Sequence, residues 1–380
     1  MAMAEREASA LLIIAASETD ANLYYATRFL APDPFTFLQV DGRTLLLMSD
    51  LEVDRAKAQA RADEVLPLSR LLRAARQRGV TGPGLSDALD EVLKPRQVTR
   101  LTVPSTFPLM MADDLRRRGY AVTPKRDPFF ERRMVKTEEE IAAIAATQRA
   151  TEEAVTCLIN LIRESEIRGD DLWLRSKPLT SEVLRKFLHV TLLGLDCVAQ
   201  HSIIAGGDQA CDPHQIGTGV LKANSPIVLD IFPQSATTRY FADMTRTVVR
   251  GKASPQVTKM YAAVREGQEI AFRVLKAGVN GRDVHGAILR YFEQEGFSTG
   301  EIGGRMQGFF HGTGHGVGLE IHEPPRVSAA SDVLQAGQVV TVEPGLYYLG
   351  HGGVRLEDMV VITETGCRNL TTFPTRLDLD

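Results

Sequence analysis

Apolar residues follow two different spacings along the chain, which predicts a mixed α/β protein. Short apolar runs bounded by turn residues predict strands, and apolar residues three or four positions apart predict helices. In the first third of the chain, the predicted strands are 11–16, 35–40 and 44–48, and the predicted helices are 52–62 and 68–76. The sequence Asp41-Gly42-Arg43 between two of these strands is typical of a hairpin turn. This part of the chain is expected to form a small α/β unit.

A second unit is expected to begin after Arg132–Lys136. Thr137 followed by Glu140 is a capping box, in which the threonine hydroxyl caps the first turn and the glutamate reaches back to the chain. Apolar residues then recur at helical spacing from Ile141 to Ile162, which predicts a long amphipathic helix. The sequence therefore predicts an N-terminal domain of residues 1–132 and a second domain of residues 133–380.

The second domain alternates predicted strands with predicted helices. The strands are expected at 226–232, 244–250, 338–342 and 354–363, and the helices at 257–276 and 283–295. The fold class predicted for the whole chain is α/β (α+β).

Each of these four strand segments brings an acidic residue into apolar surroundings. The acidic residues are Asp230, Asp243, Glu343 and Glu357. Burying an ionised carboxylate costs several kcal/mol unless a positive charge meets it. Arg246 and Arg355 are near enough in sequence to answer two of the acids but not all four.

A glycine-rich segment, 311–323, adds three histidines within twelve positions. Glycine permits close backbone approach, and neutral imidazole is a common metal ligand. Carboxylates with one imidazole suit a pair of divalent cations such as Mn²⁺ or Co²⁺ better than a closed structural zinc site. Two such cations would balance four carboxylates and make a shared water acidic enough to act as hydroxide. The sequence therefore favours a two-metal hydrolase.

Composition and charge narrow the classes of partner. The chain has 44 basic and 48 acidic residues, a formal net charge of −4, which argues against a broad surface for nucleic acid or anionic lipid. The apolar run at Leu11–Ala16 is far shorter than the roughly 20 residues that span a bilayer. The net charge and the short apolar run lead us to expect no nucleic-acid or membrane partner. The four cysteines form no CxxC pair, so we expect a reducing, cytoplasmic location.

The order of these motifs resembles the aminopeptidase P and prolidase family, whose catalytic domain has the creatinase-like pita-bread fold. The motifs that carry the resemblance are Val-Leu-Asp230, Ala-Asp243-Met-Thr-Arg-Thr, His311-Gly-Thr-Gly-His315-Gly-Val-Gly-Leu-Glu-Ile-His322-Glu, Val-Glu343-Pro-Gly-Leu-Tyr and Gly-Val-Arg355-Leu-Glu357-Asp. The resemblance covers essentially the whole chain, because this family also has a small N-terminal α/β domain. It implies cleavage of the peptide bond between an N-terminal residue and proline, by a hydroxide that bridges two metal ions. The ions are expected to be Mn²⁺, with Co²⁺, Zn²⁺ and Fe²⁺ as alternatives.

The resemblance also implies a role for each matching residue. Asp230 would bind one metal, Asp243 and Glu357 would bridge the two, and His315 and Glu343 would hold the other. Glu343 would also carry the proton of the attacking hydroxide, and Arg355 would support the bridging acids.

The remaining matches lie on the substrate side. His214 matches the substrate-side histidine of the family, and His322 matches the histidine that stabilises the oxyanion or protonates the departing nitrogen. His311 and Tyr347 match pocket-lining residues, and Arg326 would clamp the C-terminal carboxylate of a dipeptide. The family commonly forms dimers, so a homodimer acting on short proline-containing peptides is expected.

One departure concerns the spacing of Asp230 and Asp243, which are thirteen positions apart where many family members have two fewer. We interpret residues 234–240 as a longer hairpin that would reshape the rim of the pocket. Two other histidines, His285 and His351, are predicted to be surface or loop residues.

Three alternatives compete with this interpretation. A creatinase-like C–N hydrolase would work without metal, but such relatives lose several of the five ligands. A non-catalytic interaction protein of the same fold would have eroded ligands and charged tails. Methionine aminopeptidase usually lacks an N-terminal domain of about 130 residues.

Overall fold

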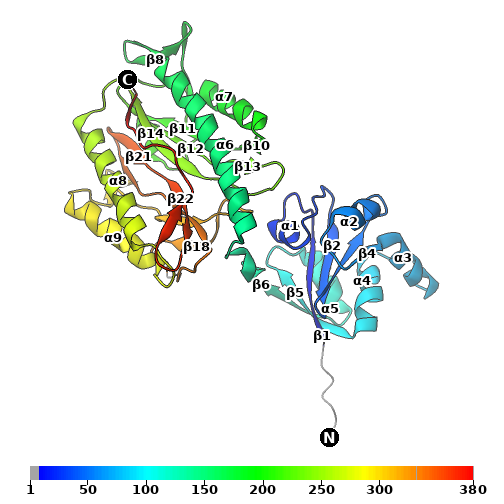
Figure 1. The fold of residues 1–380 in the computed structure, drawn as a ribbon. Coiled ribbons are helices and arrows are strands. Elements are labelled where there is room, and N and C mark those ends of the chain that lie inside the picture. The colour runs from blue at the N-terminus through cyan, green and yellow to red at the C-terminus, as the bar shows by residue number, and fades with distance from the viewer. Residues whose placement is uncertain (1–7, 331, 380) are drawn as a thin grey trace. The chain divides into compact units, whose positions relative to one another are not determined.

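The computed structural model describes residues 8–330 and 332–379, and the chain divides after Glu131 into two compact units. Both units combine helices with sheets (Figure 1), which confirms the predicted α/β class. Each unit has its own apolar core.

The first unit is built on one six-stranded mixed sheet with the order β4-β3-β2-β1-β5-β6. Its strands are β1 (Ala8–Ala15), β2 (Phe35–Val40), β3 (Arg43–Met48), β4 (Glu64–Pro67), β5 (Val98–Pro104) and β6 (Ala121–Lys125). Its helices are α1 (Ala21–Thr27), α2 (Val53–Gln59), α3 (Leu68–Gln77), α4 (Leu85–Leu93) and α5 (Leu109–Arg117). Successive residues of β1, Leu12 and Ile13, enter different apolar clusters, so both faces of the sheet are covered.

The elements predicted for this unit are present, with changed ends. The predicted strand at 35–40 and the hairpin after it are confirmed as β2 and β3. The predicted strand at 11–16 begins earlier, at Ala8, because Ala8 and Ser9 pair with β5. The predicted helix at 52–62 is shorter, because the backbone turns extended at Ala60.

The second unit opens with the predicted long helix, α6 (Glu138–Arg163). Thr137 Oγ1 accepts a hydrogen bond from the backbone N–H of Glu140, and the Glu140 carboxylate accepts one from the N–H of Thr137. The predicted capping box is therefore confirmed. Helix α6 and helix α7 (Ser181–Gly194) cover one face of a four-stranded sheet of β11 (Ile203–Gly206), β12 (Pro226–Ile231), β14 (Met244–Arg250) and β24 (Asp378–Leu379).

A five-stranded sheet and two further helices complete the second unit. The sheet has the order β18 (Glu323–Val327), β17 (Gly314–Gly316), β19 (Val339–Val342), β22 (Asp358–Ile362) and β23 (Cys367–Asn369). Helices α8 (Pro255–Val274) and α9 (Gly281–Gln294) lie side by side against this part of the unit (Figure 1). The smaller strands are β7 (Glu166–Arg168), β8 (Asp171–Leu174), β9 (Lys177–Pro178), β10 (Cys197–Val198), β13 (Gln234–Ser235), β15 (Gly300–Ile302), β16 (Arg305–Gln307), β20 (Gly345–Tyr348) and β21 (Gly352–Arg355).

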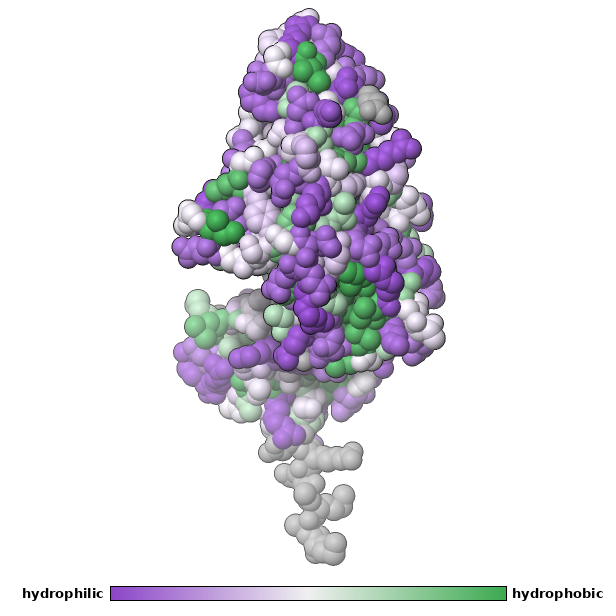
Figure 2. All heavy atoms as spheres, turned by 90° about the vertical axis from the view of Figure 1, so that its left-hand side faces the viewer, coloured by the Kyte–Doolittle hydropathy of each residue, from purple (hydrophilic) through white to green (hydrophobic). Residues whose placement is uncertain are grey.

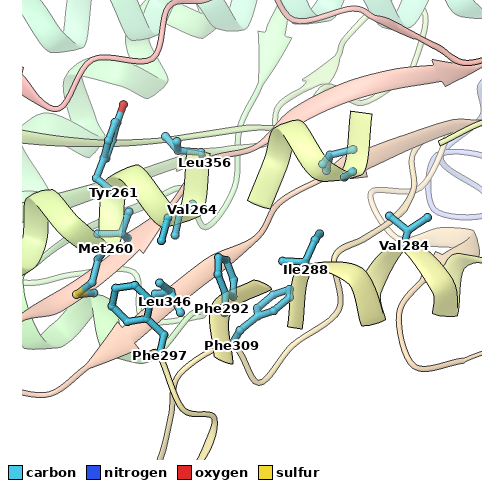
Figure 3. Close-up of a cluster of buried hydrophobic side chains, with 14 of the residues drawn as sticks. Met260, Tyr261, Val264, Val284, Ile288, Phe292, Phe297, Phe309, Leu346 and Leu356 are labelled. Carbon is cyan, nitrogen blue, oxygen red and sulfur yellow. The ribbon is translucent and has the colours of Figure 1, made fainter. Parts of the chain in front are cut away.

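Aromatic and aliphatic side chains from α8 and α9 meet the strands in a dense apolar core (Figure 3). Phe292 of α9 and Phe309 pack edge to face with ring centroids 5.5 Å apart. Val264, Ile288 and Phe292 have no exposed surface. Because fully buried apolar side chains each contribute roughly 1.5–3 kcal/mol, this core holds the two helices firmly against the strands.

The predicted strand at 354–363 is wrong as a single element. It is divided between β21, which pairs with β20, and β22, which pairs with β19. The break falls at Leu356-Glu357, where the N–H of Glu357 turns to the carbonyl of Thr245 in the other sheet. The chain therefore changes partners at Glu357.

Alternation along the strands separates the apolar core from a polar interior face. In β12, Ile227 and Leu229 enter the cluster under α6 and α7, while Asp230 faces the other way. In β19, Val340 and Val342 enter the cluster under α8 and α9. The polar positions of both sheets are thus turned away from the helices.

Within the described residues, every helix is too short or too polar to cross a membrane. Figure 2 shows a face of the molecule that is mostly hydrophilic, on which apolar residues form separate groups.

Candidate metal centre

The five residues that the resemblance implies as ligands all lie in or directly beside strands of the second unit. Asp230 is in β12, Asp243 precedes β14, His315 is in β17, Glu343 follows β19 and Glu357 precedes β22. Asp243, His315 and Glu357 each offer a ligand atom, and these atoms all lie within 4.8 Å of one another. The three residues are buried. Two sheets therefore bring three of the five side chains into one small group.

The other two acids lie beside this group. His315 Nε2 is 3.5 Å from Glu343 Oε1 and 3.7 Å from Asp243 Oδ2. Asp230 pairs with Thr245 across β12 and β14, and its carboxylate accepts a hydrogen bond of 2.7 Å from the Arg355 guanidinium. The acid that Arg355 contacts is therefore Asp230, whereas the resemblance implied support of Asp243 and Glu357.

Two threonines that the sequence analysis missed hold the centre in place. Thr245 Oγ1 donates a hydrogen bond of 2.6 Å to Glu357. Thr341 Oγ1 accepts a hydrogen bond of 3.1 Å from the N–H of His315 and donates a longer one, 3.4 Å, to Glu343. The available signal was their position inside apolar strands, two residues from an acid and thus on the same face.

Burial and mutual repulsion change the acidity of the centre. Burial first, and the neighbouring carboxylates second, raise the pKa values of Asp243 and Glu357 well above the ordinary range. Burial likewise raises the pKa of Glu343 to about 7 and lowers the pKa of His315 to about 3. Without cations the protonated forms of Asp243 and Glu357 are therefore favoured, while the imidazole of His315 is neutral and able to act as a ligand.

The donor set fits divalent cations. Asp243 Oδ1 is buried and has no hydrogen-bond partner among the described residues. In the part of the chain that the structure describes, one guanidinium, that of Arg355, forms an ion pair with one of these four acids, so most of their charge is uncompensated when they ionise. Carboxylate oxygens with one imidazole nitrogen are ligands for Mn²⁺, Co²⁺, Fe²⁺ or Zn²⁺. Cations placed among these side chains would remove both the repulsion and the unpaired oxygen.

Glycines of the segment 311–323 are required by close backbone contacts. A Cβ atom on Gly314 would lie 2.0 Å from the carbonyl oxygen of Thr341, and one on Gly316 would lie 2.4 Å from that of Pro324. Any side chain at either position would push β17 away from its neighbours. The glycines therefore let the strand carrying His315 approach β19 and β18.

Three predicted substrate-side residues lie on the exposed side of the centre. The ring of His322 is 4.4 Å from that of His315, centroid to centroid, and His322 is exposed. Arg326 is exposed and stands opposite His315 in the pairing of β17 with β18. His214 is exposed in the loop after Cys211, and the carbonyl of Pro213 in this loop accepts a hydrogen bond from Arg355. These residues are free to meet a ligand at the centre.

Tyr347 does not line an open pocket in this structure, because it has no exposed surface. Its hydroxyl lies 2.8 Å from both His311 Nε2 and Arg355 Nη1. His311 is mostly buried, and burial lowers its pKa to about 3. We expected Tyr347 to line the substrate pocket. Because it is buried, it instead supports Asp230 indirectly, through its hydrogen bond with Arg355.

The prediction for His285 was wrong. This histidine is buried in α9, and its Nδ1 lies 3.0 Å from the hydroxyl of Thr313. Thr313 in turn accepts a hydrogen bond from the N–H of Glu343. His285 is therefore attached to the backbone that carries the centre, whereas His351 is exposed as predicted.

The longer connection between Asp230 and Asp243 folds as the expected hairpin and is fixed at its tip. Within it, β13 pairs with β10, and Gln234 bridges to Phe241. The hydroxyl of Thr237 donates a hydrogen bond to Asp196 in the turn after α7. The additional residues therefore extend toward α7.

Comparison with known proteins agrees with this geometry. The chain is 29% identical over 357 residues to a Xaa-Pro dipeptidase of Pyrococcus furiosus, covering 92% of this chain and 90% of the relative. It is 30% identical over 288 residues to a Xaa-Pro dipeptidase of Pyrococcus horikoshii, covering 74% and 76%. A solved structure of an X-Pro aminopeptidase from Thermotoga maritima superposes with a TM-score of 0.81 at 26% identity, covering 98% of this chain and 97% of that one. The sequence profile described as metallopeptidase family M24 matches residues 142–364, which is more than half of the chain. The matched range includes the four acids and the one histidine of the centre. The resemblance seen in the sequence is thus confirmed, and the chain belongs to metallopeptidase family M24.

Proposed function

We propose that the protein is a metal-dependent peptidase that cleaves the bond between an N-terminal residue and a following proline. The observation that carries this proposal is the group of Asp243, His315 and Glu357, joined by Glu343 at His315. The names of the relatives, two Xaa-Pro dipeptidases and one X-Pro aminopeptidase, support the choice of bond. The preferred substrates would be dipeptides or short peptides.

Five residues of the domain proposed as 133–380 would hold two divalent cations. Asp243 and Glu357 would bridge them, Asp230 would bind one, and His315 and Glu343 would bind the other. When bound, the cations would make a water acidic enough to supply the hydroxide nucleophile, and their positive charge would stabilise a developing oxyanion. Mn²⁺ is the proposed native ion, with Co²⁺, Zn²⁺ and Fe²⁺ as alternatives.

Glu343 is the residue proposed to accept the proton of the attacking water. A carboxylate within reach of the attacking water can accept its proton and pass it on, which is the role of a general base. The hydrogen bond from Thr341 and the contact with His315 keep the carboxylate of Glu343 at the centre.

The departing proline nitrogen must gain a proton, because it is a tertiary amide in the substrate and leaves as an amine. His322 is proposed to deliver that proton or to stabilise the oxyanion, since its ring lies next to that of His315 on the exposed side. His214 would hold the substrate from the neighbouring loop. Arg326 would bind the C-terminal carboxylate of a dipeptide with its guanidinium fork.

The test is hydrolysis of a series of Xaa-Pro-(Yaa)n peptides by protein loaded with one metal at a time, with metal content measured. Cleavage before proline that disappears on chelation and in an Asp243→Ala or Glu357→Ala variant is expected. Residual activity of those variants without metal would favour the creatinase-like C–N hydrolase. Binding of protein or nucleic acid without any hydrolysis would favour the interaction protein. A homodimer in the cytoplasm is also proposed, and light scattering at micromolar concentration tests the dimer.

A further inference from the structure

Two positively charged side chains are buried in the segment that leads into α6. The side chains of Arg133 and Lys136 are only 5% and 2% exposed. Both contact the carboxylate of Glu323, which is itself 4% exposed. Arg133 donates to one carboxylate oxygen at 2.9 Å, and Lys136 donates to the other oxygen. One buried carboxylate is therefore held from both sides by charges that lie almost two hundred residues away in the sequence.

The charges within this group are balanced. Arg133 also donates a hydrogen bond of 2.7 Å to Glu320, whose side chain is half exposed. Two cations thus face two carboxylates. A buried ion that loses one partner is left uncompensated, so each member depends on the others.

The anchored residue is adjacent to a proposed catalytic residue. Glu323 directly follows His322 and begins β18, where it pairs with Gly316 of β17. The loop 317–322 between the two strands forms no ladder of its own, and the β17–β18 register shifts between His315 and Gly316. The ion pairs of Glu323 therefore add to the strand pairing at the end of a loop that has no ladder of its own.

Gly318 shows how closely the carboxylate is packed against that loop. A Cβ atom on Gly318 would lie 2.5 Å from Glu323 Oε1, so the carboxylate rests on bare backbone. The carbonyl of Gly318 accepts a hydrogen bond from the N–H of Phe241, two residues before Asp243. The loop is thus held between the buried ion pairs and the segment that leads into β14 and carries Asp243.

The segment that carries Arg133 and Lys136 also has contacts of its own with the rest of the unit. The backbone N–H of Lys136 donates to the carbonyl of Gly337, and the N–H of Gly337 donates to that of Ile362 in β22. The Lys136 ammonium also donates to the carbonyl of Met134. The backbone of Lys136 is therefore attached to the sheet that carries His315.

From these contacts we propose that Arg133 and Lys136 are positioning residues for His322, acting through Glu323. They hold the Glu323 carboxylate, and Glu323 holds the loop end that places His322 beside the metal centre. This inference rests on the proposed function in assigning a catalytic role to His322.

The test compares Lys136→Met with a matched control, Lys222→Met, which removes a lysine from an exposed ion pair with Asp171. Lys136→Met is expected to lower kcat for an Xaa-Pro dipeptide by about 10–100-fold, the usual effect of losing a residue that orients catalytic groups. KM and metal content should change little, because the interaction of His322 is made in the transition state. Lys222→Met is expected to leave kcat unchanged, and Lys136→Arg, which keeps the charge, should restore part of the loss.

A double-mutant cycle separates positioning from general damage. In a His322→Ala background, Lys136→Met should lower kcat by less than about twofold, because both changes remove the same contribution. A folded Lys136→Met variant with parental kcat, or losses that multiply in the double variant, would overturn the inference. If Lys136→Met does not fold, Glu323→Gln is used in the same cycle with the same criteria.

A second readout does not depend on activity. Hydrogen–deuterium exchange of the peptide covering 317–323 should be at least about tenfold faster in Lys136→Met than in the parental protein and in Lys222→Met. Unchanged exchange would overturn the inference even if the kinetics agree with it. If the parental protein cleaves no Xaa-Pro peptide, the proposed function fails, and the exchange rates still decide whether the cations hold the loop.

Discussion

Replacing Glu343 by glutamine should make the metal-free protein more stable at pH 8 while abolishing hydrolysis. The reason is the raised pKa of this carboxyl group, about 7 in the folded protein against an ordinary value of 4.5. The folded state holds the proton over that window and the unfolded state does not, so stability is lost as the pH rises from about 4.5 to about 7. A difference of roughly 2.5 pKa units corresponds to about 3 kcal/mol. Glutamine does not titrate and avoids this loss.

The assay is urea unfolding of chelated protein at pH 5 and pH 8. The difference in unfolding free energy between Glu343→Gln and the parental protein should grow in favour of the variant by up to about 3 kcal/mol between the two pH values. Glu364→Gln, at an exposed position, serves as the control and should show no such change. The same free-energy difference at both pH values, within about 0.5 kcal/mol, would refute the reasoning, since burial would then not raise the pKa.

Three further predictions concern packing and the substrate side. Gly314→Ala should destabilise the protein by about 3 kcal/mol or more in urea unfolding, because its Cβ would overlap a carbonyl of β19, whereas Gly366→Ala has open space and should cost far less. Phe292→Ala should lower the unfolding free energy by about 3–5 kcal/mol by leaving a cavity between α8 and α9 (Figure 3), and parental stability would contradict the core described above. Glu182→Ala removes a carboxylate that accepts the N–H of Gly219, in the same connection as His214, which is proposed to hold the substrate. Losing about 1 kcal/mol of loop stabilisation should raise KM about fivefold in peptide kinetics with kcat little changed. An unchanged KM would show that this contact does not shape the substrate side.

Strands and helices with strong periodicity could be predicted from the sequence. The run at 244–250 is a strand with the predicted ends, and the capping box at Thr137 starts α6 where expected. The run at 354–363 was not divided, although Glu357 and Asp358 interrupt its apolar residues, because a strand that brings an acid to the site can carry the same pattern. Its break depends on which sheet each half joins, and that is a tertiary interaction.

The candidate site was predictable only for residues whose chemistry is unusual in their context. Acids at the ends of apolar strands stand out, because burial makes them costly, and the structure brings Asp243 and Glu357 together with His315. Thr245 is an ordinary strand residue, so its hydrogen bond to Glu357 was not evident. His285 was misplaced because its partner, the hydroxyl of Thr313, is recognisable only once α9 is packed on the sheet.

The donors of the centre are divided between two sheets, with Asp230 and Asp243 on one and His315, Glu343 and Glu357 on the other. Bound ions would thus hold the two sheets together. Their removal by chelation would leave carboxylates of like charge facing one another between the sheets. Asparagine or glutamine in place of these acids would remove the repulsion and let the two sheets stay together, but the site would then form no nucleophile. A chain altered in this way should retain proline-containing peptides uncut, which would turn a hydrolytic scaffold into a capture reagent.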